Sequence, residues 1–134
     1  DYNEDGWSDY AVYNEESGAW YVWSRRQGGR MLVWGAQWGG NMAFVPVPGD
    51  YDGDGAADMA IYQEAFGAWF IRTLSGSVLV WGANWGAPGY APVSGDFNAD
   101  GRSDFCVFQR ATGLWFIGNL DGSIILWGAL WGVN

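Results

Sequence analysis

One acidic pattern of nine residues occurs three times in the chain, and it constrains the fold more than any other feature. The copies begin at Asp1, Asp50 and Asp96, which are 49 and 46 residues apart. Each copy has Asp at positions one, five and nine, Asp or Asn at position three, and Gly at position six. Repeats of this length are within the range of propeller blades. The sequence therefore predicts three tandem copies of one structural unit.

Three short runs of aromatic and β-branched residues follow each acidic segment, separated by turns that contain Gly. In the first copy these runs are residues 10–13, 18–22 and 32–36, and equivalent runs follow in the other two copies. A Pro-Val stretch precedes the second and third acidic segments, at Pro46-Val47 and Pro92-Val93. This pattern predicts short strands and no helix of useful length. Each unit is expected to contain four strands, and the first copy lacks its Pro-Val strand.

The predicted fold class is all-β, a β-propeller built of three tandem four-stranded blade repeats. The repeats are predicted at residues 1–49, 50–95 and 96–134, the first without its opening strand. Three blades are fewer than the roughly four to eight of a closed propeller, so one chain is expected to form an incomplete ring. A β-trefoil-like fold is the alternative, because it also has threefold repetition. It offers no explanation for the acidic segments.

The acidic segments are predicted to be metal-binding loops. Ten of the fifteen acidic residues of the chain, whose formal charge is −9, are Asp residues in these segments. Clustered carboxylates repel one another unless a cation lies among them, and hard oxygen ligands favour Ca²⁺. We expect about three Ca²⁺ per chain, held by side chains at positions one, three, five and nine and by the backbone carbonyl at position seven. The predicted ligands are Asp1, Asn3, Asp5, Trp7 and Asp9, then Asp50, Asp52, Asp54, Ala56 and Asp58, then Asp96, Asn98, Asp100, Arg102 and Asp104.

An EF-hand is the main rival explanation, and the residue at position twelve argues against it. An EF-hand closes with a bidentate Glu at that position, whereas these loops have Val12, Ile61 and Val107. Metal-free Asx turns are the other alternative. Three copies in register, each with the Asp at position nine, favour the metal.

These loops resemble those of FG-GAP (VCBS-type, α-integrin-like) repeats. That resemblance implies a β-propeller in which the acidic loop joins the first two strands of a blade and binds Ca²⁺. The chain departs from the family pattern, because no Phe-Gly precedes the loop and no Gly-Ala-Pro follows the second strand. It looks closer to bacterial variants with aromatic Gly-x-Trp strands, so integrin ligand recognition is not carried over.

Tryptophans recur at equivalent positions and have two interpretations. Packing between blades is the first. Stacking of the second Trp-Gly tryptophan of each copy on a sugar is the other, which makes Trp38, Trp85 and Trp131 candidate ligand-binding residues. Trp7 and Trp23 break the repeat and are expected to be exposed.

Composition argues against several functions. The acidic balance disfavours nucleic-acid binding, and no run is long and apolar enough to span a membrane. The chain has no His, which excludes Ser-His and Cys-His nucleophile pairs. Cys106 aligns with Ala11 and Ala60 and is expected to be a small buried residue. The clustered carboxylates are accounted for as metal ligands, so we expect no enzymatic activity and no catalytic residues.

Three functions remain open. The first is a secreted, calcium-stabilised binding module for glycan or protein, as in adhesion, located outside the cell or on its surface. The second is a structural assembly protein whose blades join with other copies of itself, or with further repeats of a longer chain, into oligomers or fibres. The third is a non-catalytic appendage of a larger enzyme.

Overall fold

The computed structural model describes residues 1–131 and confirms the all-β prediction. The end of the third predicted repeat, residues 132–134, lies outside the described residues. Apart from the 3-10 helix η1 (Arg26–Gly28), the regular elements are the strands β1 (Tyr10–Tyr13), β2 (Ala19–Ser24), β3 (Arg30–Gln37), β4 (Val45–Pro46), β5 (Met59–Gln63), β6 (Ala68–Arg72), β7 (Val78–Asn84), β8 (Tyr90–Pro92), β9 (Phe105–Gln109), β10 (Leu114–Gly118) and β11 (Ile124–Leu130).

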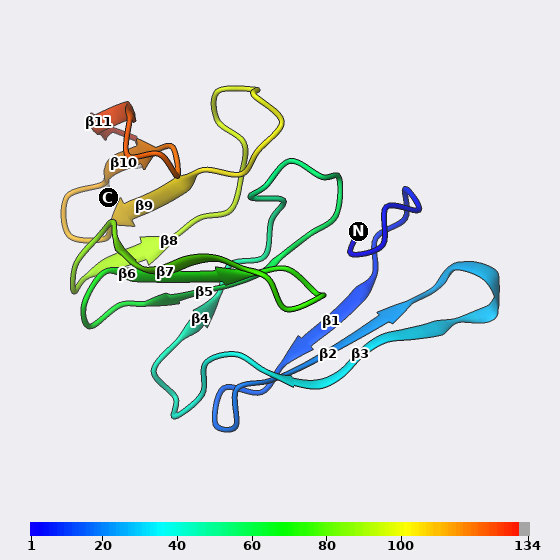
Figure 1. The fold of residues 1–134 in the computed structure, drawn as a ribbon. Helices are drawn as coiled ribbons and strands as arrows, with labels where there is room; N and C mark the ends of the chain where they lie inside the picture. The colour runs from blue at the N-terminus through cyan, green and yellow to red at the C-terminus, as the bar shows by residue number, and fades with distance from the viewer. Residues whose placement is uncertain (132–134) are drawn as a thin grey trace.

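The strands form three separate antiparallel sheets. The first sheet contains β1, β2 and β3, the second runs β4-β5-β6-β7, and the third runs β8-β9-β10-β11. Within each sheet, strands that are consecutive in sequence are neighbours. The three sheets also follow one another in space in the order of the chain (Figure 1). Each sheet is thus a local meander, and the second and third sheets also include the short strand that precedes their acidic loop.

The opening strands β4 and β8 are the shortest of their sheets. β4 pairs with β5 only through Val45↔Tyr62 and Pro46↔Ile61. Proline has no N–H and cannot donate to a ladder, so strands that contain it stay short and remain at a sheet edge. Pairing resumes beyond Pro46, where the Val47 N–H donates to the Ala60 carbonyl at 2.8 Å.

The pairing between the last two strands of every sheet contains the same irregularity. The register shifts between Trp20 and Tyr21, between Trp69 and Phe70, and between Trp115 and Phe116. On the opposite strand the shift falls within the repeated Trp-Gly-Ala segment. β-Bulges bend a strand and redirect its side chains. The Trp-Gly-Ala segment therefore has a structural role in all three copies.

Two hydrophobic clusters fill the spaces between successive sheets. Between the first and second sheets, Trp20 and Val22 pack with Met59 and Ile61. Between the second and third sheets, Trp69 is fully buried and lies 5.2 Å, centroid to centroid, from Phe105. The same strand positions build both clusters. The same apolar packing therefore joins the first sheet to the second and the second sheet to the third.

Some cross-sheet contacts occur at only one of the two junctions. Arg110 Nη1 lies 2.8 Å from Glu64 Oε1 and joins the turn of the third sheet to that of the second. The residue equivalent to Glu64 in the first sheet is Glu15, so the equivalent pair at the first junction is Glu15 and Glu64. The two junctions thus share apolar packing but differ in charge.

Three isolated predictions from the sequence are confirmed. Trp7 and Trp23 are exposed, as their departure from the repeat indicated. Cys106 is a free, fully buried thiol at the position of a small apolar residue. Burial raises the pKa of the Cys106 thiol to about 12, and the Asp104 charge adds to this effect, so the thiol is protonated near neutral pH.

Gly67, which opens the Gly-x-Trp strand of the second repeat, provides a test of this packing. A Cβ at Gly67 would clash with the backbone carbonyl of Gly86, and Gly67 has a φ of +63°. Gly89 also has a positive φ, but nothing lies within 4 Å of its Cβ position. We expect Gly67→Ala to lower the free energy of unfolding by about 3 kcal/mol or more, and Gly89→Ala by about 1 kcal/mol. Chemical denaturation measures both, and equal losses would contradict the predicted clash.

Candidate metal centres

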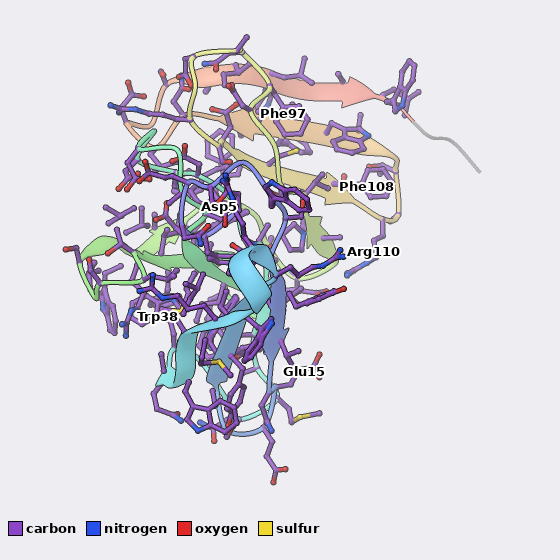
Figure 2. The ribbon with its side chains drawn as sticks, turned by 90° about the vertical axis from the view of Figure 1, so that its right-hand side faces the viewer. Asp5, Glu15, Trp38, Phe97, Phe108 and Arg110 are labelled. Carbon is purple, nitrogen blue, oxygen red and sulfur yellow. The ribbon has the colours of Figure 1, made fainter. Side chains whose placement is uncertain are left out.

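The three acidic loops occupy equivalent places in the fold. Residues 50–58 join β4 to β5, residues 96–104 join β8 to β9, and residues 1–9 lead into β1. The loops therefore lie at the same end of their sheets, before the strand that carries the core residues. Figure 2 shows Asp5 in the first loop, at the other end of β1 from Glu15.

Backbone N–H groups hold the loop carboxylates in the same arrangement in all three copies. One oxygen at position one accepts a hydrogen bond from the Gly at position six, at 2.7 Å for Asp1, 2.9 Å for Asp50 and 2.8 Å for Asp96. One oxygen at position five accepts from the N–H at position seven, at 2.9, 2.8 and 2.9 Å. The backbone therefore curls each loop around its own acidic side chains.

Position nine is tied to the start of its loop. Oδ2 of Asp9, Asp58 and Asp104 accepts from the backbone N–H at position two at 2.7, 2.8 and 2.7 Å. Asp58 and Asp104 are buried, whereas Asp9 is half-buried. Oδ1 of Asp9 is inaccessible to solvent and has no hydrogen-bond partner. A buried carboxylate oxygen without a donor is costly, and a cation would satisfy it.

The second loop brings its carboxylates closest together. Oxygens of Asp50, Asp52 and Asp58 all lie within 4.8 Å of one another. Asp54, a predicted ligand, is not part of this group. Burial raises the pKa of Asp58 to about 7, and the charges of Asp52, Asp54 and Asp50 act in the same direction. A divalent cation among these oxygens would replace that repulsion by attraction.

The first and third loops have Asn at position three, and its amide interacts with position five. Asn3 Nδ2 donates to Asp5 Oδ2 at 3.1 Å, and Asn98 Nδ2 donates to Asp100 Oδ2 at 3.2 Å. These donors partly neutralise a repulsion that remains in the second loop. In every loop, backbone N–H groups thus bind the carboxylates at positions one, five and nine. The three-carboxylate group occurs in the second loop.

The fit to Ca²⁺ follows from the donor set. The groups that converge are carboxylate and amide oxygens, and Ca²⁺ takes six to eight oxygen ligands with flexible geometry. The position-seven carbonyls of Trp7, Ala56 and Arg102 belong to the same turns, and their role as ligands stays a prediction. The residues of the second loop therefore fit a calcium ion, and calcium in the first and third loops stays a prediction.

Neighbouring loops are also joined to each other. The Ala57 N–H donates to the Asp1 carbonyl at 2.7 Å, and the Ser103 N–H donates to the Asp50 carbonyl at 2.6 Å. Position eight of each loop thus binds position one of the preceding loop. The candidate metal centres are therefore coupled to the stacking of the sheets.

The predicted ligand-binding tryptophans Trp38 and Trp85 lie between sheets. Trp38 Nε1 donates to the Phe70 carbonyl at 3.2 Å, and Trp85 Nε1 donates to the Phe116 carbonyl at 3.1 Å. Both indoles are half-buried. Their N–H groups thus contribute to packing, the first of the two interpretations. Trp131 is 75% exposed, because no described sheet follows the third.

Sequence reasoning missed the tryptophans with the more open faces. Trp81 lies 5.7 Å from Trp38, and Trp127 lies 6.0 Å from Trp85, in edge-to-face contact. Trp34, Trp81 and Trp127 are all strongly exposed. The bulge in the Trp-Gly-Ala segment was the signal available in sequence, since a Gly after a strand aromatic suggests a redirected side chain.

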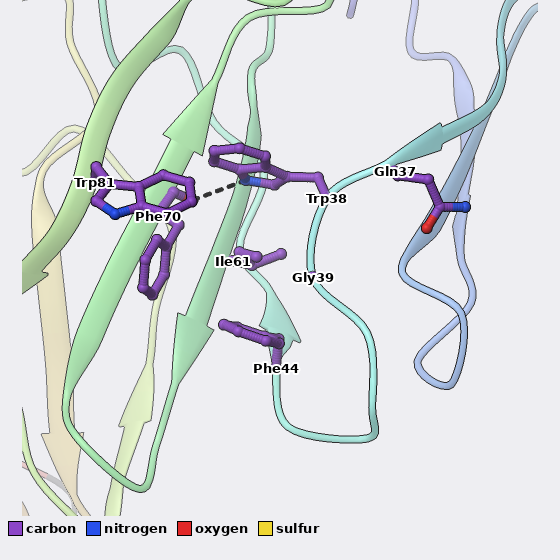
Figure 3. A pocket seen from close by; sticks show the side chains of 7 residues that line it. All are labelled: Gln37, Trp38, Gly39, Phe44, Ile61, Phe70 and Trp81. Atoms are coloured by element: carbon purple, nitrogen blue, oxygen red, sulfur yellow. Dashed lines mark hydrogen bonds between the residues drawn. The ribbon is translucent and has the colours of Figure 1, made fainter.

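A cavity of about 400 Å³ opens beside Trp38 and Trp81, with Phe44, Ile61 and Phe70 on its walls (Figure 3). An equivalent cavity of about 300 Å³ lies between the second and third sheets, beside Trp85 and Trp127. Equivalent residues line both cavities. The repeat thus creates the same aromatic depression at each junction.

Comparison with known proteins gives one match. Within residues 1–131, no helix has the length and apolar character needed to cross a membrane. No curated protein and no solved structure gives a significant match to the chain. Residues 1–61 match the family model of the FG-GAP-like repeat. The resemblance expected from the acidic loops is therefore confirmed, and the chain carries an FG-GAP-like repeat over residues 1–61.

Proposed function

We propose that this chain is a calcium-stabilised β-propeller module of an extracellular or cell-surface protein, and that it binds other molecules without catalysing a reaction. FG-GAP-like repeats often occur in extracellular adhesion and binding modules. The observation that carries the proposal is the hydrogen-bond framework shared by all three acidic loops. It holds carboxylate oxygens together at considerable electrostatic cost unless a cation is bound.

Calcium would be held by the side chains at positions one, three, five and nine of each loop. It would supply positive charge at points where the chain has only acceptors. Three Ca²⁺ would change the formal charge from −9 to −3. Because the loops bind each other through position eight, ordering the loops would also favour the stacked sheets.

The propeller interpretation is supported by the repeated contact between sheets. Separate meanders of three or four strands that pack face to face, with their loops at one end, are the expected arrangement of successive blades. The β-trefoil alternative receives no such support, since each repeat here forms its own sheet. A closed ring, and the number of blades in it, is part of this proposal.

Glycan is the ligand class we propose. The cavities beside Trp38 and Trp85 have aromatic walls, and Trp81 and Trp127 expose ring faces at their rims. The C–H faces of sugars are apolar and pack against such rings. Ligand sites are commonly concave and lined mainly by apolar and aromatic side chains.

A second candidate function is assembly between chains. The outer faces of the first and third sheets carry exposed apolar residues at positions that are buried at the two internal junctions. A role as a non-catalytic appendage of a larger enzyme is compatible with either function. No specific observation favours it.

We expect three Ca²⁺ to bind per chain, and the second loop to empty last because Asp52 adds a fourth carboxylate there. Asp52→Asn should weaken that site to the level of the others, and Asn98→Asp should strengthen the third. Isothermal titration calorimetry of the three proteins measures site number and affinity. Fewer than two sites in the unmodified chain would contradict the proposal.

Calcium should raise thermal stability strongly. An ion that binds only the folded state contributes about 2.7 kcal/mol per site at a hundredfold excess over its dissociation constant. Asp54→Ala should lower the melting temperature in calcium and reduce the further loss caused by EDTA. Glu16→Ala removes the same charge at an exposed position outside the loops and should leave both values nearly unchanged. A melting curve that excess EDTA does not alter would refute calcium stabilisation.

Glycan binding should depend on the rim tryptophans. Titration with a panel of defined oligosaccharides, followed by NMR, should shift the indole signals of Trp81 and Trp127. Trp81→Ala should abolish binding at the first cavity and leave the second intact. Phe66→Ala removes an exposed aromatic ring that does not line either cavity, and it should bind like the unmodified chain. Equal binding by all variants would exclude these cavities as the site.

A further inference from the structure

We propose that the exposed face of the third sheet docks onto the exposed face of the first sheet of a second copy, head to tail. This contact would repeat the two junctions already present in the chain. It deepens the assembly function proposed above, and it depends on neither glycan binding nor catalysis. The occupant of both faces is the chain itself.

The first sheet exposes residues that its successors bury. Tyr10 and Val12 on β1 are 59% and 62% exposed. Their counterparts Met59 and Ile61, and likewise Phe105 and Val107, are buried against the preceding sheet. The β1 face of the first sheet is thus apolar, as in the other two sheets, although no described sheet covers it.

The third sheet exposes the complementary surface. Phe97 is 42% exposed, whereas its counterpart Tyr51 is 1% exposed beneath the following sheet. Phe97, Trp115, Leu126, Leu130 and Trp131 line one apolar depression of about 330 Å³. Figure 2 shows Phe97 on the third repeat, away from Trp38.

Trp131 is already held as its counterparts are. The Trp115 indole donates to the Trp131 carbonyl at 2.9 Å, as Trp69 does to Trp85 at 2.9 Å. The backbone N–H of Trp131 donates to Gly113 at 3.0 Å, as that of Trp85 does to Gly67 at 2.8 Å. The backbone of Trp131 is therefore held as that of Trp85 is, and the Trp131 indole can contact a following sheet in the same way.

The hydrogen bonds at the two internal junctions predict equivalent hydrogen bonds between the two docked copies. Trp38 and Trp85 donate to the carbonyls of Phe70 and Phe116, and the corresponding residue of the first sheet is Tyr21. Trp131 would thus donate to the Tyr21 carbonyl of the second copy. Ser8 of the second copy, at position eight, would donate to the Asp96 carbonyl, as Ala57 does to Asp1.

The residues that break the repeat also fit this contact. At position seven, the Arg102 side chain approaches Gly53, at position four of the preceding loop. Trp7 occupies position seven in the first loop, is exposed, and would lie against Ala99 of the neighbouring copy.

Charge is complementary at the turns. The junction between the second and third sheets pairs Glu64 with Arg110. The equivalent residues in the docked pair are Arg110 of one copy and Glu15 of the other, which also have opposite charges. The internal first junction has Glu15 and Glu64 at these positions instead. The third face therefore matches the first face at least as well as an internal junction does.

A head-to-tail contact uses two different surfaces, so it forms a ring if the rotation closes and an open chain if it does not. Two copies would contribute six sheets, which is within the range of about four to eight blades in closed propellers. The contact is thus expected to produce a closed dimer, and larger assemblies if closure fails.

Two variants test the contact, each blocking one face. Val12→Arg blocks the first-sheet face, Trp131→Asp blocks the third-sheet face, and both positions are exposed in the single chain. Phe66→Asp is the control, since Phe66 is an exposed apolar residue on a turn of the middle sheet. Circular dichroism and melting curves establish that all three fold. Analytical ultracentrifugation with calcium present measures their mass against 14.7 kDa for the monomer.

We expect the unmodified chain and Phe66→Asp to self-associate at micromolar concentration, and each blocked variant to be monomeric. An equimolar mixture of Val12→Arg and Trp131→Asp should form a one-to-one dimer, because one free face remains on each and they are complementary. An unmodified chain that stays monomeric, or a mixture that stays monomeric, would overturn the proposal. Association that all variants retain would also overturn it. Calcium binding by any of these proteins tests the loops separately.

Discussion

The structure depends on one constraint, which is that no sheet in this chain can bury its own apolar faces. Each sheet has three or four short strands, and an isolated sheet of this size leaves at least one hydrophobic face in water. Trp20 and Trp69 are buried only because the next sheet covers them. Stability is therefore cooperative along the stack, as in other repeat proteins in which neighbours supply the core.

The acidic loops add a second, electrostatic form of coupling to this stack. Within a loop, the backbone holds carboxylates that repel one another. Between loops, position eight of one binds the carbonyl at position one of the preceding loop. Any ligand that relieves the repulsion also fixes the ends of the strands that carry the core. Metal binding and sheet packing therefore stabilise each other.

The repeat was visible in sequence because its chemistry is local. Acidic positions, Gly at position six and the alternation of the strands required no knowledge of tertiary contacts, and the all-β architecture with its three sheets followed from them. The FG-GAP-like character of residues 1–61 was recognisable for the same reason. The Gly of the Trp-Gly-Ala segment indicated a bulge but not which tryptophan would turn outward, because Trp38 and Trp81 are both followed by Gly. One is turned between the sheets and the other outward by a bulge whose effect appears only in pairing. The separation of Asp54 from the tightest carboxylate group was likewise set by the curvature of the loop and not by its spacing.

The ion pair between Arg110 and Glu64 has a consequence for how the chain reaches its native order. Repeats that resemble one another this closely can associate in the wrong sequence during folding, with one sheet taking the place of another. At the first junction the corresponding side chains, Glu15 and Glu64, are both acidic, whereas packing of the third sheet directly on the first would pair Arg110 with Glu15. The apolar contacts make all neighbours acceptable, whereas these few charges distinguish among them. The charge differences between the copies therefore do not favour the native order over a mispaired intermediate in which the third sheet packs on the first.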